Sequence, residues 1–449
     1  MNYNLFIDNF RGFANARIPI TDVNFLVGQN STGKTSVLGL LKVFWGPRFL
    51  FQQEFGDEEV NFGRFSDMVS AHSDDKTFFR VGLVWEELRG KKDQKIALGW
   101  LCTFREEEGL PRLSGYTFFR ESEKISLRFN GNDIRFKTES YPTSKSVEEA
   151  LTTLLPQWID EHCAPKESYE KLSLPKGLAG KIPIIMALSM IGGIGESSGG
   201  KNKPRKAIKL VLNPPDMAFS SEVTWIAPIR TKPRRTYDEL TLAFSPEGGH
   251  TPYLIRRMLR SRSQAARFRA FIEKVGAASG LFQDVRIKSF GSARTGPFEV
   301  DIVLDGKALN LSTVGYGVSQ SLPVLVELLA REYGTWFAIQ QPEVHLHPRA
   351  QAALGDVFFE MAAAEHKLFL VETHSDFTID RFRMNYKKDR PDKPDSQILF
   401  FERRDKHNVV IPLKIGKSGE LPAHQPESYR QFFIKEELRL LGVSEPCVS

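Results

Sequence analysis

Eight consecutive residues, Gly28 to Thr35, have the types and spacing needed to hold a phosphate group. Their sequence, GQNSTGKT, fits the pattern G-x-x-x-x-G-K-[ST] at every fixed position. Residues 23–27 before them are typical of a short buried strand, and the apolar residues of 36–44 follow helical spacing. A strand, a glycine-bounded turn and a helix start direct several backbone N–H groups at one anion. We therefore predict a nucleotide phosphate site in this turn.

Two side chains of the turn add defined chemistry. Lys34 supplies a mobile positive charge for the β- and γ-phosphates, and Thr35 offers a hydroxyl to Mg²⁺. ATP and Mg²⁺ are thus the predicted cofactors. The residues expected to contact the nucleotide from this segment are Gly28, Gln29, Asn30, Ser31, Thr32, Gly33, Lys34, Thr35 and Ser36.

A buried strand in the second half of the chain ends in polar residues. Residues 334–339 are apolar and aromatic, and Gln340, Gln341 and Glu343 follow them. Phosphate-loop ATPases place two carboxylates here, of which one holds the Mg²⁺ water shell and the next polarises the attacking water. Gln340, the expected metal-side position, and Gln341 are amides, so Glu343 is the only carboxylate of this turn. We predict catalytic roles for these three residues.

Glutamine keeps a carbonyl acceptor, but it lacks the negative charge and cannot take a proton from water at pH 7. Three interpretations follow: Glu343 acts alone and hydrolysis is slow, one glutamine replaces a natural glutamate through engineering and traps ATP, or ATP is a structural clamp. We expect firm nucleotide binding with low turnover. Gln340→Glu should raise turnover if position 340 is the metal side. If only Gln341→Glu does so, the two roles are reversed.

Three further turns carry polar residues. The turn at 311–320 is rich in glycine and serine and opens an apolar helix, and the apolar strand at 367–371 is followed by His374. His345 and His347 form a His-x-His pair that could bind a metal ion, although no further ligands lie nearby in the sequence. His347 could instead be a helix-entry residue, and His374 an ordinary polar residue of a strand-to-helix turn.

These segments together resemble the ABC-type ATPases of the RecF, OLD and SMC-like group. The likeness covers roughly residues 1–100 and 300–385. The opening segment is Phe10-Arg11-Gly12-Phe13, Walker A is Gly28 to Thr35, and the signature loop is Val314 to Gln320. The end of Walker B with the D-loop is Pro342 to Pro348, and the switch-histidine loop is Thr373-His374-Ser375. Within the group, the chain looks most like stand-alone ATPases of bacterial anti-phage systems such as PARIS and Septu.

The resemblance implies a mechanism that needs two copies of the chain. In ABC-type heads, the Walker A loop of one protomer faces the signature loop of another, and two ATP molecules lie between the heads. Gly315, Gly317 and Ser319 would then meet the γ-phosphate of the partner's nucleotide. Arg11 is expected at the nucleotide, and His374 would sense the γ-phosphate. A homodimer is therefore the minimum active unit, and larger oligomers are compatible with it.

The expected fold class is α/β: an ABC-type ATPase head, with a mixed β-sheet core flanked by helices, and a mostly helical inserted lobe. The lobe should begin with a strand meander near 78–140, which includes a hairpin turn at Asn130 to Asp133. An amphipathic helix around 147–158, a buried helix at 182–194 and a loop at 192–206 should follow. The predicted segments are head 1–100, lobe 101–295, head 296–385, and a tail at 386–449 that completes the head or contacts a partner.

Composition limits the class of protein. The chain has 449 residues, 41% hydrophobic and 26% charged, which is ordinary for a globular protein. Three cysteines without metal or redox spacing favour a reducing compartment, and the N-terminus lacks the features of a signal peptide. We therefore expect a cytoplasmic protein with no membrane partner.

Two basic runs, at 230–235 and 256–262, could be solvated surface or could bind DNA, RNA or an acidic protein. The net charge of +6 permits nucleic-acid binding without requiring it. Aromatic residues do not interleave with these arginines, so base stacking is not indicated.

The resemblance implies an ATP-gated sensor and scaffold of an anti-phage complex. Such a protein holds and releases a separate nuclease effector, and a phage protein or nucleic acid is the trigger. The tail has no nuclease-like acidic cluster, which assigns cleavage to the separate effector. The alternative is a RecF-like DNA-repair or recombination ATPase that binds DNA directly. Turnover stimulated by DNA would favour this alternative.

Overall fold

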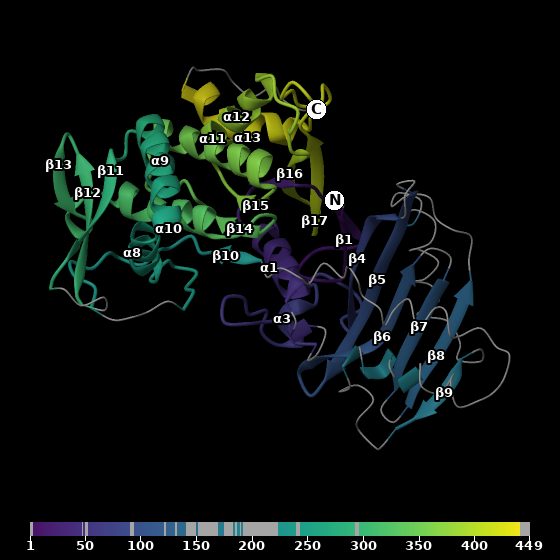
Figure 1. Cartoon of the computed structure of the whole chain (residues 1–449). Coiled ribbons are helices and arrows are strands. Elements are labelled where there is room, and N and C mark those ends of the chain that lie inside the picture. Colours follow the sequence, from purple (N-terminus) through teal and green to yellow (C-terminus); the bar gives the residue numbers. More distant parts are fainter. Residues whose placement is uncertain are drawn as a thin grey trace. The chain divides into compact units, whose positions relative to one another are not determined.

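The computed structural model shows two compact units, each built from separate stretches of the chain (Figure 1). The first comprises Met1–Thr21, Gln29–Glu222 and Phe401–Pro412, and the second comprises Asp22–Gly28, Val223–Phe400 and Leu413–Ser449. The structure describes residues 3–46, 48–49, 53–89, 94–120, 123–130, 133–140, 150, 169–174, 183–184, 186–188, 190–191, 223–238, 243–291 and 296–440.

The first unit contains an eight-stranded antiparallel sheet in the order β2-β1-β4-β5-β6-β7-β8-β9. The predicted strand meander is confirmed, as is the hairpin that Asn130 and Asp133 close by pairing with each other. The strands are β1 (Tyr3–Asp8), β2 (Ala16–Ile20), β4 (Phe78–Arg89), β5 (Gln94–Glu107), β6 (Leu110–Arg120), β7 (Glu123–Asn130), β8 (Asp133–Ser140) and β9 (Glu170–Ser173).

Aromatic contacts join the helix α1 (Lys34–Trp45) to this sheet. The ring of Phe44 meets Trp100 of β5 edge-on at a centroid distance of 4.9 Å, and Trp45 meets Tyr3 of β1 at 5.3 Å. Large buried rings of this kind supply much of the hydrophobic stabilisation of a core. The short helix α3 (Phe65–Met68) also belongs to this unit.

Three predicted features of the lobe fall largely outside the described residues. The helix around 147–158 and the loop at 192–206 lie outside them, residue 150 apart. Of the predicted buried helix at 182–194, the described residues 184, 186–188 and 190–191 are helical. Ile184, Ala187, Leu188 and Ile191 are buried there, as expected.

The second unit is organised around a six-stranded sheet in the order β10-β14-β15-β3-β16-β17. Neighbours from β10 to β3 are parallel, and their apolar runs are buried, as in sheets covered on both faces. The chain passes into the first unit within β16 and returns within β17. The strands are β3 (Val23–Gly28), β10 (Thr224–Ile226), β14 (Trp336–Gln340), β15 (Leu368–Glu372), β16 (Ser396–Arg404) and β17 (His407–Lys414).

Helices pack closely around the parallel strands. Phe358 of α11 contacts Phe369 of β15 at a ring distance of 5.3 Å. A Cβ atom on Gly355 would lie 2.3 Å from the Thr378 carbonyl oxygen, so only glycine lets α11 and α12 approach so closely. The helices are α8 (Thr251–Arg260), α9 (Arg262–Ser279), α10 (Tyr316–Ala330), α11 (Pro348–Glu365), α12 (Asp376–Met384) and α13 (Glu427–Leu440).

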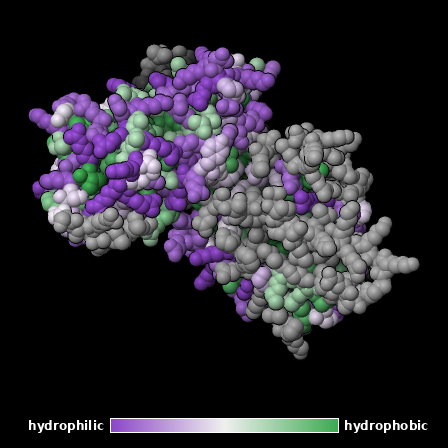
Figure 2. Space-filling view, in the orientation of Figure 1, coloured by the Kyte–Doolittle hydropathy of each residue, from purple (hydrophilic) through white to green (hydrophobic). Residues whose placement is uncertain are grey.

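A small antiparallel sheet, β11-β12-β13, completes the second unit, with strands β11 (Asp284–Ser289), β12 (Phe298–Leu304) and β13 (Lys307–Asn310). The expected fold class is confirmed, since a mixed sheet flanked by helices carries the predicted motifs. Figure 2 shows hydrophilic residues over most of the coloured surface. Across the part of the chain that the structure describes, no helix combines the length and apolarity needed to cross a membrane.

Candidate functional site

Three parallel strands of the second unit end at one edge of the sheet. Gln340 ends β14 and pairs with Glu372, which ends β15, and Glu372 pairs in turn with Leu26 of β3. Gly28, two residues after Leu26, ends β3 and begins the phosphate loop. Ligands of open α/β sheets bind at the carboxyl ends of the strands. The edge formed by Gly28, Glu372 and Gln340 is therefore the candidate site.

The phosphate loop continues from Gly28 into the first unit. It turns sharply at Ser31 (φ 61°) and Gly33 (φ 95°), and α1 begins at Lys34. The Lys34 ammonium donates to the Gln29 carbonyl oxygen at 2.7 Å, and the Thr32 hydroxyl donates to the same oxygen at 2.7 Å. These bonds hold the positive charge inside the loop, as an anion cradle requires.

Residues far away in the sequence support the loop within the first unit. A Cβ atom on Gly33 would lie 2.4 Å from the ring of Phe13, so the opening segment packs directly against the loop. The Arg403 guanidinium donates to the Ser31 carbonyl oxygen at 2.9 Å, and the Asn408 amide donates to the Arg11 carbonyl oxygen at 3.0 Å. The sequence analysis missed Arg403 and Asn408, because nothing local marks them as neighbours of the loop.

Arg11 is held by backbone groups of the first unit. Its guanidinium donates to the carbonyl oxygens of Asp67 at 3.0 Å and Phe62 at 2.9 Å, and it lies over the Phe62 ring. Burial lowers the pKa of Arg11, although the charge of Asp67 opposes that shift. These contacts give Arg11 a structural role near the loop. Its predicted contact with the nucleotide stays a prediction.

The turn after β14 brings the predicted catalytic residues together. The Gln340 amide donates to the Glu372 carboxylate at 3.3 Å, and the backbone N–H of Gln341 donates to the Glu372 carbonyl oxygen at 2.8 Å. Glu343 accepts the backbone N–H of His374 at 2.7 Å. Burial raises the pKa of Glu343, and the bond from His374 opposes that shift. Gln340, Gln341, Glu343 and His374 thus form one cluster of the second unit.

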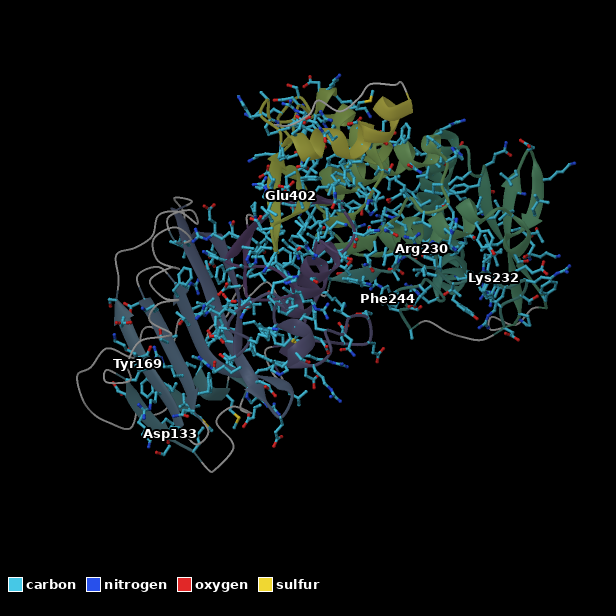
Figure 3. The ribbon with its side chains drawn as sticks, turned by 180° about the vertical axis from the view of Figure 1, so that it is seen from behind. Asp133, Tyr169, Arg230, Lys232, Phe244 and Glu402 are labelled. Carbon is cyan, nitrogen blue, oxygen red and sulfur yellow. The ribbon has the colours of Figure 1, made fainter. Side chains whose placement is uncertain are left out.

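Arg230, just after β10, is a buried member of the same cluster (Figure 3). Its guanidinium donates to the Gln340 carbonyl oxygen at 3.2 Å, and its backbone N–H donates to the Gln320 side chain of α10 at 3.3 Å. Burial lowers the pKa of Arg230 to about 10, against the opposing charge of Glu343. Within the described residues, Nε and Nη1 of Arg230 and Oε2 of Glu343 make no hydrogen bond. Buried polar atoms of this kind mark a place for water or a ligand.

The prediction that both basic runs are surface is wrong at two positions. Arg230 is 4% exposed and Arg256 is 7% exposed. The Arg256 guanidinium donates to the Gly296 carbonyl oxygen and lies over the Phe298 ring, so it stabilises the core. Linear spacing could not show which arginine points inward. The exposed members are Lys232, Arg234, Arg235, Arg257, Arg260 and Arg262.

The predicted signature turn is open at the start of α10. Gly315 and Tyr316 are exposed, and a Cβ atom on Gly315 would meet no atom of the chain within 4 Å. The turn lies beside the loop after β14, because a Cβ atom on Gly317 would lie 3.1 Å from the His345 carbonyl oxygen. Ser319 is buried, and its hydroxyl donates to the Tyr316 carbonyl oxygen at 3.0 Å. The N-terminus of α10 is therefore exposed at Gly315 and Tyr316.

The two histidines after β14 are exposed. His347 caps α11 by accepting the backbone N–H of Ala350 at 3.4 Å, which supports its role as a helix-entry residue. The His345 ring lies 5.7 Å from that of Tyr316. Among the residues that are described, no group of three or more His, Cys, Asp or Glu side chains could hold a metal ion.

The donors needed for a nucleotide-bound Mg²⁺ are nevertheless present. Such an ion takes one or two carboxylates or hydroxyls from the protein, and phosphate oxygens and waters supply the rest. Thr35, an exposed residue of the first unit, carries a hydroxyl at the start of α1, and in the second unit the strand edge carries Gln340 and Glu372. When bound, Mg²⁺ neutralises charge on the β- and γ-phosphates. The chemistry of these residues therefore fits the ion.

Comparisons with known protein families agree with this site. Residues 1–171 match a family described as AAA ATPase domain, and residues 237–380 match one described as AAA domain, putative AbiEii toxin, Type IV TA system. The first stretch contains the phosphate loop. The second contains the signature turn, the turn after β14 and His374. Both stretches that carry the site are thus similar to AAA-type ATPase domains.

Several solved structures are similar to the chain at low identity. The SMC head domain from Thermotoga maritima is 11% identical over 91% of this chain and 98% of that one, with a TM-score of 0.40. The Smc head with an extended coiled coil from Pyrococcus furiosus is 10% identical over 98% and 100%, at 0.41. The recombination mediator RecF is 12% identical over 91% and 97%, at 0.27. None of the curated proteins compared with the chain matches it.

Proposed function

We propose that this protein is an ATPase of the RecF- and SMC-like ABC type that binds ATP firmly, hydrolyses it slowly and works as a homodimer. The observation that carries the proposal is the shared strand edge, where Gly28 begins the phosphate loop beside Glu372 and Gln340. An anion cradle at such an edge is suited to a nucleotide triphosphate.

Slow turnover follows from the residue types after β14. Gln341 stands where a carboxylate would polarise the attacking water, and an amide cannot accept its proton. Glu343 is nine-tenths buried and accepts the backbone N–H of His374, so its structural task is to hold the switch loop. We infer that ATP mainly holds the assembly closed.

Nucleotide binding is tested directly by calorimetry on the purified chain. Lys34→Ala removes the charge held inside the loop and should abolish ATP binding. Lys307→Ala, at an exposed position of β13, is the matched control and should bind ATP normally. Failure of the unsubstituted, folded chain to bind ATP would contradict the proposal.

We propose further that the protein is the sensor and scaffold of an anti-phage complex that holds a separate nuclease effector. The support is the sequence resemblance to PARIS- and Septu-like ATPases. A nuclease-like reading frame beside its gene, and co-purification of the two products, would support this role. Release of the nuclease when a phage trigger protein is added would test the gating.

The alternative, a RecF-like repair or recombination ATPase, is favoured by the exposed basic residues Lys232, Arg234 and Arg235. Under this alternative, DNA should stimulate ATP turnover by the purified chain alone. Because counterions are released on binding phosphates, the affinity should also fall steeply as salt rises. Turnover that is indifferent to DNA would remove the alternative.

A further inference from the structure

We propose that Glu372, at the end of β15, supplies the metal-side carboxylate that Gln340 lacks. This inference rests on the proposed ATP-binding function and names the residue that completes its Mg²⁺ site. Sequence reasoning assigned no role to Glu372. In the structure, Glu372 lies beside Gln340 at the edge of the sheet where the parallel strands end.

The first argument is the pairing of Glu372 with Gln340. Their side chains lie side by side at the ends of parallel strands, and the Gln340 amide donates to one Glu372 carboxylate oxygen at 3.3 Å. A carboxylate at position 340 would repel Glu372, because two adjacent carboxylates cannot both ionise readily. An amide instead orients Glu372 and still offers a neutral oxygen. The pair therefore keeps one negative charge and several oxygen donors, which suits Mg²⁺.

The second argument is the order of the strands. β15 lies between β14 and β3, so Glu372 is one strand nearer to the phosphate loop than Gln340 is. Neighbouring strands are about 4.8 Å apart. The backbone N–H of Thr373 donates to the Leu26 carbonyl oxygen at 3.2 Å, which ties the end of β15 to the strand that begins the loop. Glu372 therefore ends the strand next to β3, whose last residue, Gly28, begins the phosphate loop.

Arg230 follows β10 and therefore places a positive charge on the side of β14 away from β15. The buried guanidinium of Arg230 donates to the Gln340 carbonyl oxygen. A positive group held there disfavours a divalent cation at the end of β14, since like charges repel strongly in a buried site. The charges of Arg230 and Glu372 therefore favour a cation at the end of β15 rather than at the end of β14.

The experiment measures ATP affinity with Mg²⁺ and with EDTA for four proteins: the unsubstituted chain, Glu372→Gln, Gln340→Glu, and the double variant with both changes. Glu372→Gln should lose at least about tenfold of the affinity that Mg²⁺ adds, in line with losses at metal sites. Its affinity in EDTA should not change. The double variant should not recover the effect, because its carboxylate stands at the end of β14, beside Arg230. Glu332→Gln, at an exposed position, is the matched control.

A second readout is independent of affinity. Mn²⁺ replaces Mg²⁺, and its electron paramagnetic resonance spectrum with bound ATP should differ between the unsubstituted chain and Glu372→Gln. If Glu372→Gln unfolds, Glu372→Asp is used instead, and it should keep part of the Mg²⁺ effect.

The outcomes separate the inference from the proposed function. If ATP binds and the Mg²⁺ effect survives Glu372→Gln, the inference is overturned while the proposed function stands. If the double variant recovers the Mg²⁺ effect, a carboxylate at position 340 serves as the metal side, which also overturns the inference. If the unsubstituted chain binds no ATP in either buffer, both fail.

Discussion

In the proposed mechanism, Gln341 is the residue that limits the rate of ATP hydrolysis. Its left-handed backbone (φ 43°) and its hydrogen bond to the Glu372 carbonyl oxygen fix the turn after β14. The same turn carries Glu343, which is buried and has one carboxylate oxygen bonded to the backbone N–H of His374. We therefore expect general-base catalysis to be the step that this cluster lacks.

Gln341→Glu should raise ATP turnover by about 100-fold, the lower end of what a positioned general base contributes. The change keeps the side-chain length and adds the missing proton acceptor. A coupled phosphate-release assay measures it, and Gln341→Asn, which adds no charge, is the control and should stay slow. Equal rates for Gln341→Glu and the unsubstituted chain would show that position 341 does not hold the base.

Local patterns predicted the residues of the loop and turns well. The strand, glycine turn and helix around Lys34 were predictable because periodicity, glycine and lysine all lie within one short segment. The burial of Arg230 and the role proposed for Glu372 were not, since both depend on the strand order β10-β14-β15-β3. That order pairs strands that are not neighbours in the sequence, which no local pattern encodes. Sequence reasoning also missed Arg403 and Asn408, because these residues lie far from the phosphate loop and Arg11 in the sequence.

At the scale of elements, a buried hydrogen bond between Glu327 and His250 joins α10 to the start of α8. Glu327 of α10 is 2% exposed and is hydrogen-bonded to His250, which caps α8, and it accepts the Arg331 guanidinium at 2.7 Å. Burial raises the pKa of Glu327, but the His250 bond and the Arg331 charge outweigh it, so this pKa lies below the ordinary 4.5. The pair holds the helix that carries the signature turn.

Glu327→Gln should lower the free energy of unfolding by about 3 kcal/mol near pH 7, the cost of removing one partner of a buried pair. Because the folded pKa is depressed, the contribution of Glu327 is fully present above pH 4.5 and is lost as pH falls below that value. Denaturant unfolding at several pH values measures this difference. Glu332→Gln, at an exposed position, should change it by less than about 0.5 kcal/mol. A gap that widens toward low pH would contradict the assigned role of Glu327.

At the scale of the whole molecule, the N-terminus of α10 is the predicted contact for the γ-phosphate of a partner's nucleotide. Gly315 and Tyr316 expose it, and the loop after β14 lies beside it. In the proposed dimer, this surface meets the nucleotide held by the partner's phosphate loop. Each copy would complete the other's site, so ATP binding and association should be one event.

Gly315→Asp separates association from folding. Its added side chain meets no atom of the same chain within 4 Å at Cβ, so the protein should fold and bind ATP. In the dimer, its carboxylate would face a triphosphate and repel it. The control is Ala308→Asp, at an exposed position of β13, which adds the same charge away from the turn.

The most direct test is the mass of the purified protein in solution, with and without ATP and Mg²⁺, by light scattering or native mass spectrometry. The account predicts a single chain of 50.9 kDa without nucleotide and twice that mass with it. Ala308→Asp should behave in the same way, whereas Gly315→Asp should stay at the mass of one chain with ATP bound. A mass that does not respond to saturating ATP, or a Gly315→Asp protein that pairs normally, would contradict it.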